Sequence, residues 1–449
     1  MSDASSRRSF IKKGVAAGLA GIAAPTIIPS GVLAQPGRRV GANDRVAMGG
    51  IGGGSRGGGV IAGFHNMEDA DVLAVADVDL TRARQVGASL QAEVYQDYRR
   101  LLDRKDIDAV MVAAPDHWHA IISIHAMQAG KDVYCEKSMS HTVHEGRVMS
   151  DASRRYDRIL MVGSQQRSQE RFYRAAMLIR NGHLGKITRV LGVNFAGPWE
   201  NALPAEPIPD GLDWDMWCGP VEPHPYNSNL KTSRASPGWL SIREFCGGEI
   251  SGWGTHDLDQ VQWALGMDDS GPIEVWVEGK PYEPWVARTP DRVGRFFGAK
   301  DPTIHYRYPG DIVVDLAEDR NPDGGGVFYG SEGSVRIERS VVEYSNPDLL
   351  TVPLESMQIQ LERSTNHNLN FINSVRNRTL PITHGEIGHR SATVCHLGNI
   401  ARWVSQRTGE TGVRLQWDPV AERFTNNEWA NHYLDRPRRK PWTLPDISS

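Results

Sequence analysis

Residues 45–57 read RVAMGGIGGGSRG, and this stretch decides the fold of the chain. A short apolar run opens it, as is typical of a buried strand, and glycines follow at once. Gly52, Gly54 and Gly57 have the spacing G-x-G-x-x-G. The first glycine allows a tight turn, the second lets a pyrophosphate approach the backbone, and the third lets a helix pack closely. The alternative is a plain glycine-rich turn, because a chain with 46 glycines produces this spacing by chance.

A second apolar run, from Asp71 to Ala76, ends in Asp77. In a dinucleotide-binding βαβ unit, an acidic residue roughly 20 positions after the glycines receives the ribose hydroxyls of the adenosine. Asp77 stands near that position, although an acid also suits an ordinary turn at a strand end. With both parts present we predict a dinucleotide cofactor, and Asp77 favours NAD because an acid repels a 2′-phosphate. Arg82 and Arg84 lie close behind and keep NADP as the alternative.

The N-terminus has the pattern of an export signal. Residues 7–12 read RRSFIK, a short glycine-rich apolar run covers 14–28, and residues 32–34 read VLA, a small-residue cleavage site. We predict a twin-arginine signal peptide over 1–34 rather than a membrane span, and therefore a periplasmic or otherwise exported protein. The alternative is an unstructured tail with two chance arginines.

Composition indicates a globular enzyme. The 449 residues suffice for two domains with separate cores. The net charge of −4 gives no basic field for nucleic acid and no polybasic patch for a membrane surface. The four cysteines are scattered without a C-x-x-C pair, so we expect neither a metal site nor a disulfide framework. We predict a nucleotide-binding domain over 45–165 and a substrate-binding and oligomerisation domain over 166–449.

Strand and helix patterns alternate through the first domain. A helix is expected from about Gly58, and a buried strand over 107–113 leads through PDHWH to a helix over 120–130. A further strand over 132–135 is followed by EKS at 136–138. Ligands of such sheets bind at the carboxyl ends of the strands, so we expect both of these segments beside the nicotinamide. Alone, a histidine there is more often a helix cap, and a lysine a solvated charge.

The second half is less regular. A last strand over 160–167 and a helix over 170–181 precede a Pro- and Trp-rich excursion over 198–239, and long loops of this kind line a site or make a subunit contact. Short β-type runs recur over 273–351. The Trp-, Arg- and Pro-rich tail over 417–445 is expected to wrap on the surface or on a neighbouring subunit.

Several segments together resemble the Gfo/Idh/MocA oxidoreductases, the family of glucose-fructose oxidoreductase and inositol dehydrogenase. The matching segments are IGGGSRG (51–57), ADVD (76–79), APDHWH (114–119), AGKDVYCEK (129–137), GTHDLDQVQWALG (254–266), FINSVR (371–376) and EIGHRSAT (386–393). The resemblance implies an α/β Rossmann domain followed by an α+β domain. In the second domain an open, mainly antiparallel sheet serves as substrate wall and oligomer face, so a homo-oligomer, a dimer or tetramer, is expected.

The resemblance also implies the site. Lys137 would contact the substrate hydroxyl, and His256 would be the acid or base. Imidazole suits this role because it titrates near neutral pH. Asp259 is the third catalytic motif residue, either reacting or, as the alternative, orienting its neighbours. Without the family, His256 would be interpreted as a buried histidine at a helix start. The cofactor-binding residues implied are Gly52, Gly54, Ser55, Arg56, Gly57, Asp77, Pro115, His119, Glu136 and Lys137.

Two departures from the family pattern matter. Ser138 stands where the family has proline after its Glu-Lys pair, and Gly252 stands where an Asp commonly precedes the histidine by four residues. That Asp supports the histidine, so Asp257 or Glu249 would have to compensate. The segment from Trp253 to His256 also resembles, loosely, the Tyr-x-x-His segment of the NAD-dependent glycosidases of this superfamily.

Three hypotheses follow for the function. The first is a cofactor-retaining oxidoreductase acting on a sugar, glycoside or cyclitol, since an exported enzyme has no nicotinamide pool to exchange with. The second is an NAD-dependent glycoside hydrolase that works by transient oxidation and elimination. The third is a binding protein without activity, which the retained Lys137 and His256 argue against.

Overall fold

The computed structural model describes residues 45–234, 237–288, 301–318 and 325–448. The predicted signal peptide, residues 1–34, lies outside the described residues. Within the described ranges, no helix combines the length and the apolar character needed to cross a membrane.

The first half forms a six-stranded, all-parallel sheet in the order β3-β2-β1-β4-β5-β6. The strand order changes direction between β1 and β4, and ligands of such sheets bind at this switch point, beyond the carboxyl ends of the strands. The strand bounds are β1 Val46–Ile51, β2 Ala70–Ala76, β3 Glu93–Tyr95, β4 Ala109–Val112, β5 Asp132–Cys135 and β6 Leu160–Val162. The predicted Rossmann class is confirmed.

Five helices connect these strands: α2 Ser55–His65, α3 Leu80–Leu90, α4 Tyr98–Leu102, α5 Asp116–Gln128 and α6 Val143–Arg155. Two of these helices begin earlier in the sequence than predicted. The helix expected from Gly58 begins at Ser55, because the close contact of Gly57 with the preceding loop draws the first turn onto the strand end. The helix expected from Ala120 begins at Asp116, directly after Pro115, whose fixed φ suits a helix start.

The second half forms a nine-stranded sheet in the order β15-β14-β13-β7-β12-β11-β9-β16-β17. β7 and β12 pair in parallel and the other neighbours are antiparallel, which confirms the predicted open, mainly antiparallel sheet. The strand bounds are β7 Ile187–Val193, β9 Glu274–Glu278, β11 Thr303–Tyr308, β12 Ile312–Glu318, β13 Gly326–Gly330, β14 Gly333–Ile337, β15 Val342–Tyr344, β16 Leu415–Asp418 and β17 Arg423–Phe424.

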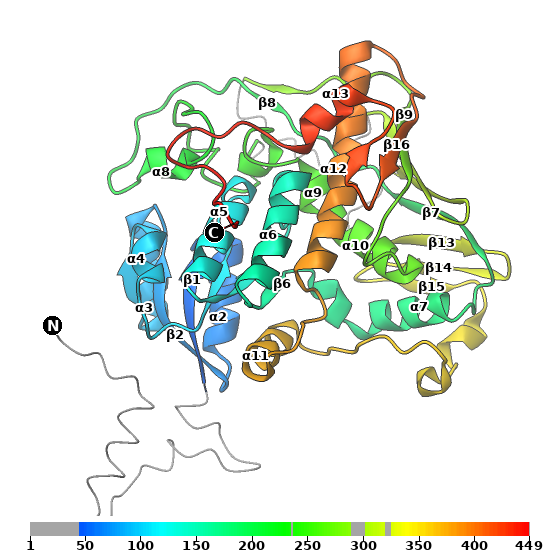
Figure 1. The fold of residues 1–449 in the computed structure, drawn as a ribbon, viewed down its shortest axis with the longest axis horizontal. Helices are drawn as coiled ribbons and strands as arrows, with labels where there is room; N and C mark the ends of the chain where they lie inside the picture. Colours follow the sequence, from blue (N-terminus) through cyan, green and yellow to red (C-terminus); the bar gives the residue numbers. More distant parts are fainter. Residues whose placement is uncertain (1–44, 235–236, 289–300, 319–324, 449) are drawn as a thin grey trace, which may run out of the picture. The chain divides into compact units, whose positions relative to one another are not determined.

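Helices pack on this sheet and enclose the larger core. α7, α10 and α12 contact its strands, and α12 also runs beside α6 of the first half (Figure 1). The helix bounds are α7 Glu170–Arg180, α9 Glu249–Gly252, α10 Gly254–Leu265, α11 His367–Asn377, α12 Gly385–Thr408 and α13 Glu428–Asn431. Because α12 contacts both α6 and the sheet, it joins the two halves of the chain.

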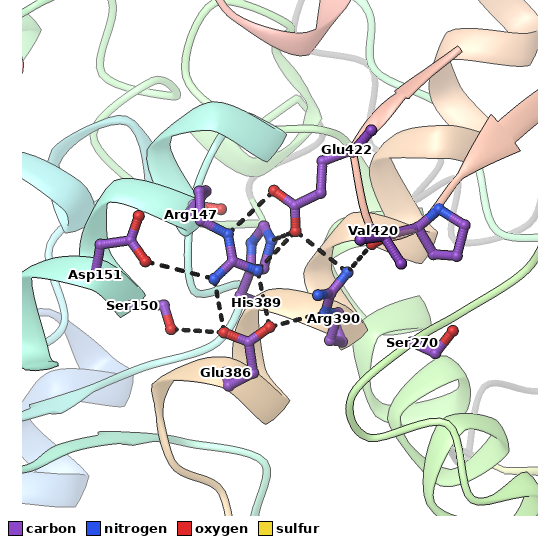
Figure 2. A network of polar contacts seen from close by, with 12 residues as sticks. Arg147, Ser150, Asp151, Ser270, Glu386, His389, Arg390, Val420 and Glu422 are labelled. Carbon is purple, nitrogen blue, oxygen red and sulfur yellow. Dashed lines mark hydrogen bonds and ion pairs between the residues drawn. The ribbon is translucent and has the colours of Figure 1, made fainter. Parts of the chain in front are cut away.

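An ion-pair network strengthens the junction of α6 and α12. The Arg147 guanidinium of α6 donates to both carboxylate oxygens of Glu386 on α12, at 2.7 and 2.8 Å. It also donates to Glu422, which precedes β17, at 2.6 and 3.1 Å, and Glu422 in turn contacts His389 and Arg390 of α12 (Figure 2). These charges therefore tie three segments that lie far apart in the sequence.

The Pro- and Trp-rich excursion packs on the nucleotide-binding half. It contains α8 Trp214–Cys218 and β8 Glu200–Asn201, which pairs with β10 Val286–Ala287. The Leu80 N–H donates to the Gly211 carbonyl at 2.9 Å, and the Asp213 N–H donates to the Val78 carbonyl at 3.0 Å. The excursion is thereby fixed beside the carboxyl end of β2.

The C-terminal tail also returns to the first half. Arg436 and Arg438 each donate to Glu145 of α6, whose side chain is buried. The Trp442 ring packs edge-on against Trp118 of α5, with ring centroids 4.9 Å apart. The later part of the tail therefore wraps on this chain's own first half, as one of the two predicted outcomes had it. The expectation was wrong for the start of the tail, because Trp417 and Phe424 lie in β16 and β17 and pack in the core of the second half.

Candidate active site

Two adjoining cavities open at the carboxyl ends of the parallel strands. The glycine cleft has a volume of about 270 Å³, and its lining includes Gly52, Gly54, Asp77, Pro115, Trp118 and Lys231. The Lys137 cavity has a volume of about 370 Å³, and its lining includes Lys137, His256, Asp116, Trp253, Arg234 and Arg339. Ser55, Arg56 and Trp239 line both, so the two cavities share a wall.

Glycine suits each of the three motif positions for a different physical reason. Gly52 has φ +92°, and a Cβ there would lie 2.6 Å from the Ala113 backbone, so only glycine allows this turn. A Cβ on Gly57 would lie 1.9 Å from the Gly52 carbonyl oxygen. Gly54 differs, because a Cβ there would meet nothing within 4 Å and would project into open space at the start of α2.

This geometry fits a dinucleotide. Gly54 lines the cleft and stands at the N-terminus of α2 without a side-chain cap, so the first backbone N–H groups of the helix remain available to an anion. A pyrophosphate would occupy the open space that a larger residue at Gly54 would fill. Gly52, Gly54, Ser55, Arg56 and Gly57 all line the cleft, and cofactor binding by them stays a prediction.

Asp77 lies at the end of β2 and also lines the cleft. The N–H groups of Gly53 and Asp79 donate to its two carboxylate oxygens, at 2.7 and 2.9 Å. Burial raises the pKa of Asp77, and the Arg82 guanidinium 3.5 Å away opposes that shift. Lys231 of the excursion reaches Asp79 at 2.9 Å and lines the same end of the cleft, a contact that no sequence pattern indicated.

Lys137 and His256 line the same cavity, although 119 positions separate them in the sequence (256 − 137). Lys137 follows β5 at the strand end. Burial lowers the pKa of its ammonium group, and Arg234 lowers it further, while Glu136, Asp116 and Glu249 act in the opposite direction. A lysine of this kind gives up or shares a proton more readily than an exposed one.

His256 lies in the first turn of α10 and is 6% exposed. Its Nδ1 is buried and has no hydrogen-bond partner among the described residues. Burial and the nearby charges of Lys137 and Arg339 hold the pKa of His256 well below its usual range. The imidazole is therefore neutral at physiological pH and has a nitrogen lone pair with which to accept a proton.

The space beside Gly252 is occupied by an ion pair. A Cβ on Gly252 would lie 2.9 Å from Glu249 Oε2 and 3.4 Å from an Arg234 nitrogen. The Arg234 guanidinium donates to both Glu249 oxygens, at 2.8 and 3.1 Å. Of the two residues proposed to compensate for the missing Asp, Glu249 lies beside Gly252 and is paired with Arg234. Asp257 faces elsewhere, since its Oδ1 accepts from the Gly325 N–H.

His119 lines the Lys137 cavity but is held by the backbone. Its Nδ1 lies 2.7 Å from the Ser138 carbonyl oxygen, and its Nε2 lies 2.7 Å from the Ala114 carbonyl oxygen. Both contacts form only when both nitrogens carry protons. Burial alone would lower the pKa of His119, but Cys135, Asp116 and the Ser138 carbonyl raise it to about 10. This imidazolium ties the ends of β4 and β5 together.

Other predicted residues fall in two groups. Glu136 lines the Lys137 cavity and accepts from Arg56 at 2.9 Å, and Pro115 lines the glycine cleft. Asp259 lines neither cavity, which favours the orienting role over the reacting one. Its buried carboxylate accepts from Arg167 at 2.9–3.1 Å and from Ser391 at 2.8 Å. Its geometry is that of a residue that positions α10 rather than one that touches a substrate.

Sequence reasoning missed part of the cavity wall. Arg234, Leu240 and Arg339 line the Lys137 cavity, and Ser233 lines both cavities. The expectation that the long excursion lines a site was the only signal for the residues near 234–240. Arg339 follows β14, and nothing in the sequence connects it with Lys137.

Comparison with known proteins agrees with this architecture. The family described as "Oxidoreductase family, NAD-binding Rossmann fold" matches residues 45–164, and "Oxidoreductase family, C-terminal alpha/beta domain" matches residues 178–444. Levoglucosan dehydrogenase of Pseudarthrobacter phenanthrenivorans is 26% identical over 58% of this chain and 62% of its own. Myo-inositol 2-dehydrogenase of Thermotoga maritima is 28% identical over 33% of this chain and 45% of its own. The match thus spans less than two thirds of either relative.

Solved structures share the fold at lower identity. The WlbA dehydrogenase from Bordetella pertussis, in complex with NADH and UDP-GlcNAcA, has a TM-score of 0.59 at 18% identity, covering 84% of this chain and 99% of that one. A levoglucosan dehydrogenase, in complex with NADH and levoglucosan, has a TM-score of 0.56 at 19% identity, covering 83% and 99%. With both family domains matched in order over most of its length, the chain belongs to the Gfo/Idh/MocA oxidoreductase family.

Proposed function

We propose that the protein is an NAD(P)-dependent oxidoreductase that transfers a hydride between a tightly bound nicotinamide cofactor and a secondary hydroxyl of a sugar, glycoside or cyclitol. The observation that supports this most is the placement of Lys137 and His256 in one cavity that shares a wall with the glycine cleft. A dinucleotide bound along the cleft would bring its nicotinamide end to that wall. Asp77 favours NAD over NADP.

The chemistry assigned to each residue follows from its protonation. The nicotinamide, when bound, accepts the hydride. The Lys137 ammonium donates a hydrogen bond to the substrate hydroxyl and stabilises the negative charge that develops on its oxygen. His256 lines the same cavity as Lys137 and is assigned the hydroxyl proton, because a neutral imidazole has a nitrogen lone pair that accepts one. Asp259 holds α10 through Arg167 and so positions His256 from outside the cavity.

Retention of the cofactor is supported by the excursion. Its residues Met216, Trp217, Lys231 and Trp239 line the glycine cleft together with the motif glycines. Lys231 is paired with Asp79 at 2.9 Å, which fixes the excursion against the end of β2. We expect a cofactor held between the excursion and the motif loop to exchange slowly. This suits an exported enzyme, and export by the twin-arginine route remains a prediction from residues 1–34.

Purified protein loaded with NAD tests the proposal. With a panel of sugars, aryl glycosides and cyclitols, reduced nicotinamide should accumulate on the protein and disappear when a second, oxidised sugar is added. Release of aglycone from aryl glycosides without net reduction would instead support the NAD-dependent glycosidase. Failure to bind any nucleotide would contradict both and favour the binding protein without activity. The expected homo-oligomer remains a prediction.

A further inference from the structure

One end of the segment 211–233 of the excursion is anchored to the nucleotide-binding half through main-chain groups. The Gln96 side-chain amide donates to the Val78 carbonyl at 2.9 Å and to the Gly211 carbonyl at 3.0 Å, so it joins the two chains of the contact. The indole N–H of Trp118 donates to two carbonyl groups of α8, at 3.1 Å each. Trp118 is buried, and these bonds hold the base of the segment in place.

The other end of the segment is held by an ion pair. The Lys231 ammonium donates to Asp79 Oδ2 at 2.9 Å, and its side chain is 24% exposed. Asp79 Oδ1 has different partners, because it accepts from two N–H groups in the first turn of α3. Burial raises the pKa of Asp79, but Lys231 and Arg82 lower it below its usual range, so the carboxylate is charged at neutral pH. The pair can therefore open to water while the cap of α3 stays in place.

This ion pair lies at the end of the glycine cleft where the adenosine is expected. Lys231, Thr232 and Ser233 are consecutive in the sequence, and all three line the cleft. Asp77, the residue expected to receive the ribose hydroxyls, lines the cleft as well and accepts from the Asp79 N–H at 2.9 Å. Asp79 itself is not among the described residues that line either cavity. Its carboxylate therefore acts on a bound nucleotide through Lys231 rather than by contact.

From this arrangement we propose that the segment 211–233 is a clasp on the cofactor: Lys231, paired with Asp79, closes the adenosine end of the glycine cleft, and a dinucleotide enters or leaves only after the pair opens. The inference rests on the proposed function, since it takes the glycine cleft as the dinucleotide site. It adds the contact that sets the rate of cofactor exchange. The pair joins two protein groups and needs no nucleotide to form, so it hinders entry as well as exit.

The kinetics of nucleotide exchange test the clasp. Mixing NADH-loaded protein with excess NAD gives the release rate from the loss of bound NADH fluorescence, and mixing nucleotide-free protein with NADH gives the association rate. Lys231→Met should raise both rates about tenfold, because it removes a hydrogen bond between charged groups and keeps a side chain of similar length. Lys231→Arg should restore slow exchange. Unchanged rates in Lys231→Met, or a rise in the release rate alone, would overturn the clasp.

Asp79→Asn distinguishes the clasp from a direct attraction between Lys231 and the nucleotide. Asparagine still caps α3, but the ion pair is lost. Asp79→Asn should therefore speed exchange as Lys231→Met does, and the double variant should be no faster than either. Slower release from Asp79→Asn would mean that the freed Lys231 binds the nucleotide itself, which contradicts the clasp. Lys186→Met is the matched control and should leave both rates unchanged, because Lys186 is an exposed lysine that lines neither cavity.

The clasp and the proposed function fail in different ways. If wild-type protein exchanges NADH as fast as Lys231→Met while sugars still reduce the bound cofactor, the clasp fails and the oxidoreductase proposal stands. If exchange depends on the Lys231–Asp79 pair but no sugar reduces the cofactor, the oxidoreductase proposal fails and the clasp stands. If the protein takes up neither NAD nor NADH, both fail.

Discussion

The glycine cleft and the Lys137 cavity lie side by side but are built in opposite ways. The motif part of the cleft comes from one continuous stretch, β1 and the start of α2, and its shape is fixed by backbone geometry at Gly52 and Gly57. The cavity is assembled from residues spread between 55 and 339, which come from α2, α5, the strand ends, the excursion, α10 and the segment after β14. The shape of the cleft therefore depends on backbone geometry, while the shape and charge of the cavity depend on side chains.

The largest expected effect is a loss of turnover, and it should distinguish the Lys137 cavity from the glycine cleft. Lys137→Ala removes the ammonium that stabilises the developing alkoxide, so turnover should fall by about 10³-fold or more. Nucleotide binding should be unaffected, because the cleft keeps its motif loop. Fluorescence of bound nucleotide and steady-state rates measure both. Loss of the nucleotide together with the activity would show that the two regions are not independent.

The second-largest expected effect is on the turnover of a variant of His256, the proposed base. His256→Ala should lower turnover by about 10²-fold. Because the pKa of His256 is well below its ordinary value, the imidazole stays neutral as pH falls, and wild-type turnover should not show a histidine-type decline between about pH 8 and pH 6. A pH–rate profile checks this. A rate that halves near the ordinary histidine pKa would contradict the lowered pKa of His256, and full turnover in the alanine variant would remove His256 from the role of base.

A substitution in the cleft tests its fit to the cofactor. Gly54→Val places a side chain in the open space at the start of α2 and should weaken NAD binding roughly tenfold or more, about 1.4 kcal/mol. Gly59→Ala is the control, since it lies on the same helix and its Cβ would also meet nothing within 4 Å. Equal NAD affinities in both variants would argue against a pyrophosphate at Gly54.

The smallest effect concerns the junction of the two halves and its response to pH. Although burial disfavours its charge, hydrogen bonds from His389 and Arg147 lower the pKa of Glu422 to about 2. A depressed carboxyl pKa stabilises the folded state above the unfolded value near 4.3, and this stability is lost as pH falls toward 2. Glu422→Gln should therefore lose about 1–3 kcal/mol at neutral pH and show a weaker acid dependence.

Denaturant titrations at neutral and acidic pH measure this difference. Glu170→Gln serves as the control, because its ion pair with Arg363 lies on the surface and contributes little. Identical acid dependence in wild type and Glu422→Gln would show that the network in Figure 2 does not couple to folding.

The contrast between the cleft and the cavity also explains which site residues could be predicted from the sequence. Gly52 could be predicted from the motif spacing, because the turn there needs the positive φ that glycine adopts readily. The fold class followed from the alternation of apolar runs. Lys137 and His256 were found through a family resemblance that marks their motifs. Arg339 was not, because no period or motif links a residue after β14 to a site at the end of β5. Asp259 was expected in the site, and only the fold reveals that Arg167 holds its carboxylate outside it.

The central claim is that this chain retains a nicotinamide cofactor and uses it on a carbohydrate hydroxyl. The most direct measurement takes the purified protein without added nucleotide and records the absorbance and fluorescence of nicotinamide, before and after addition of neutral and acidic sugars. The account predicts bound cofactor that becomes reduced by a sugar and stays reduced until a second, oxidised sugar is added. A protein that contains no nicotinamide, and takes up neither NAD nor NADP when they are supplied, would contradict it.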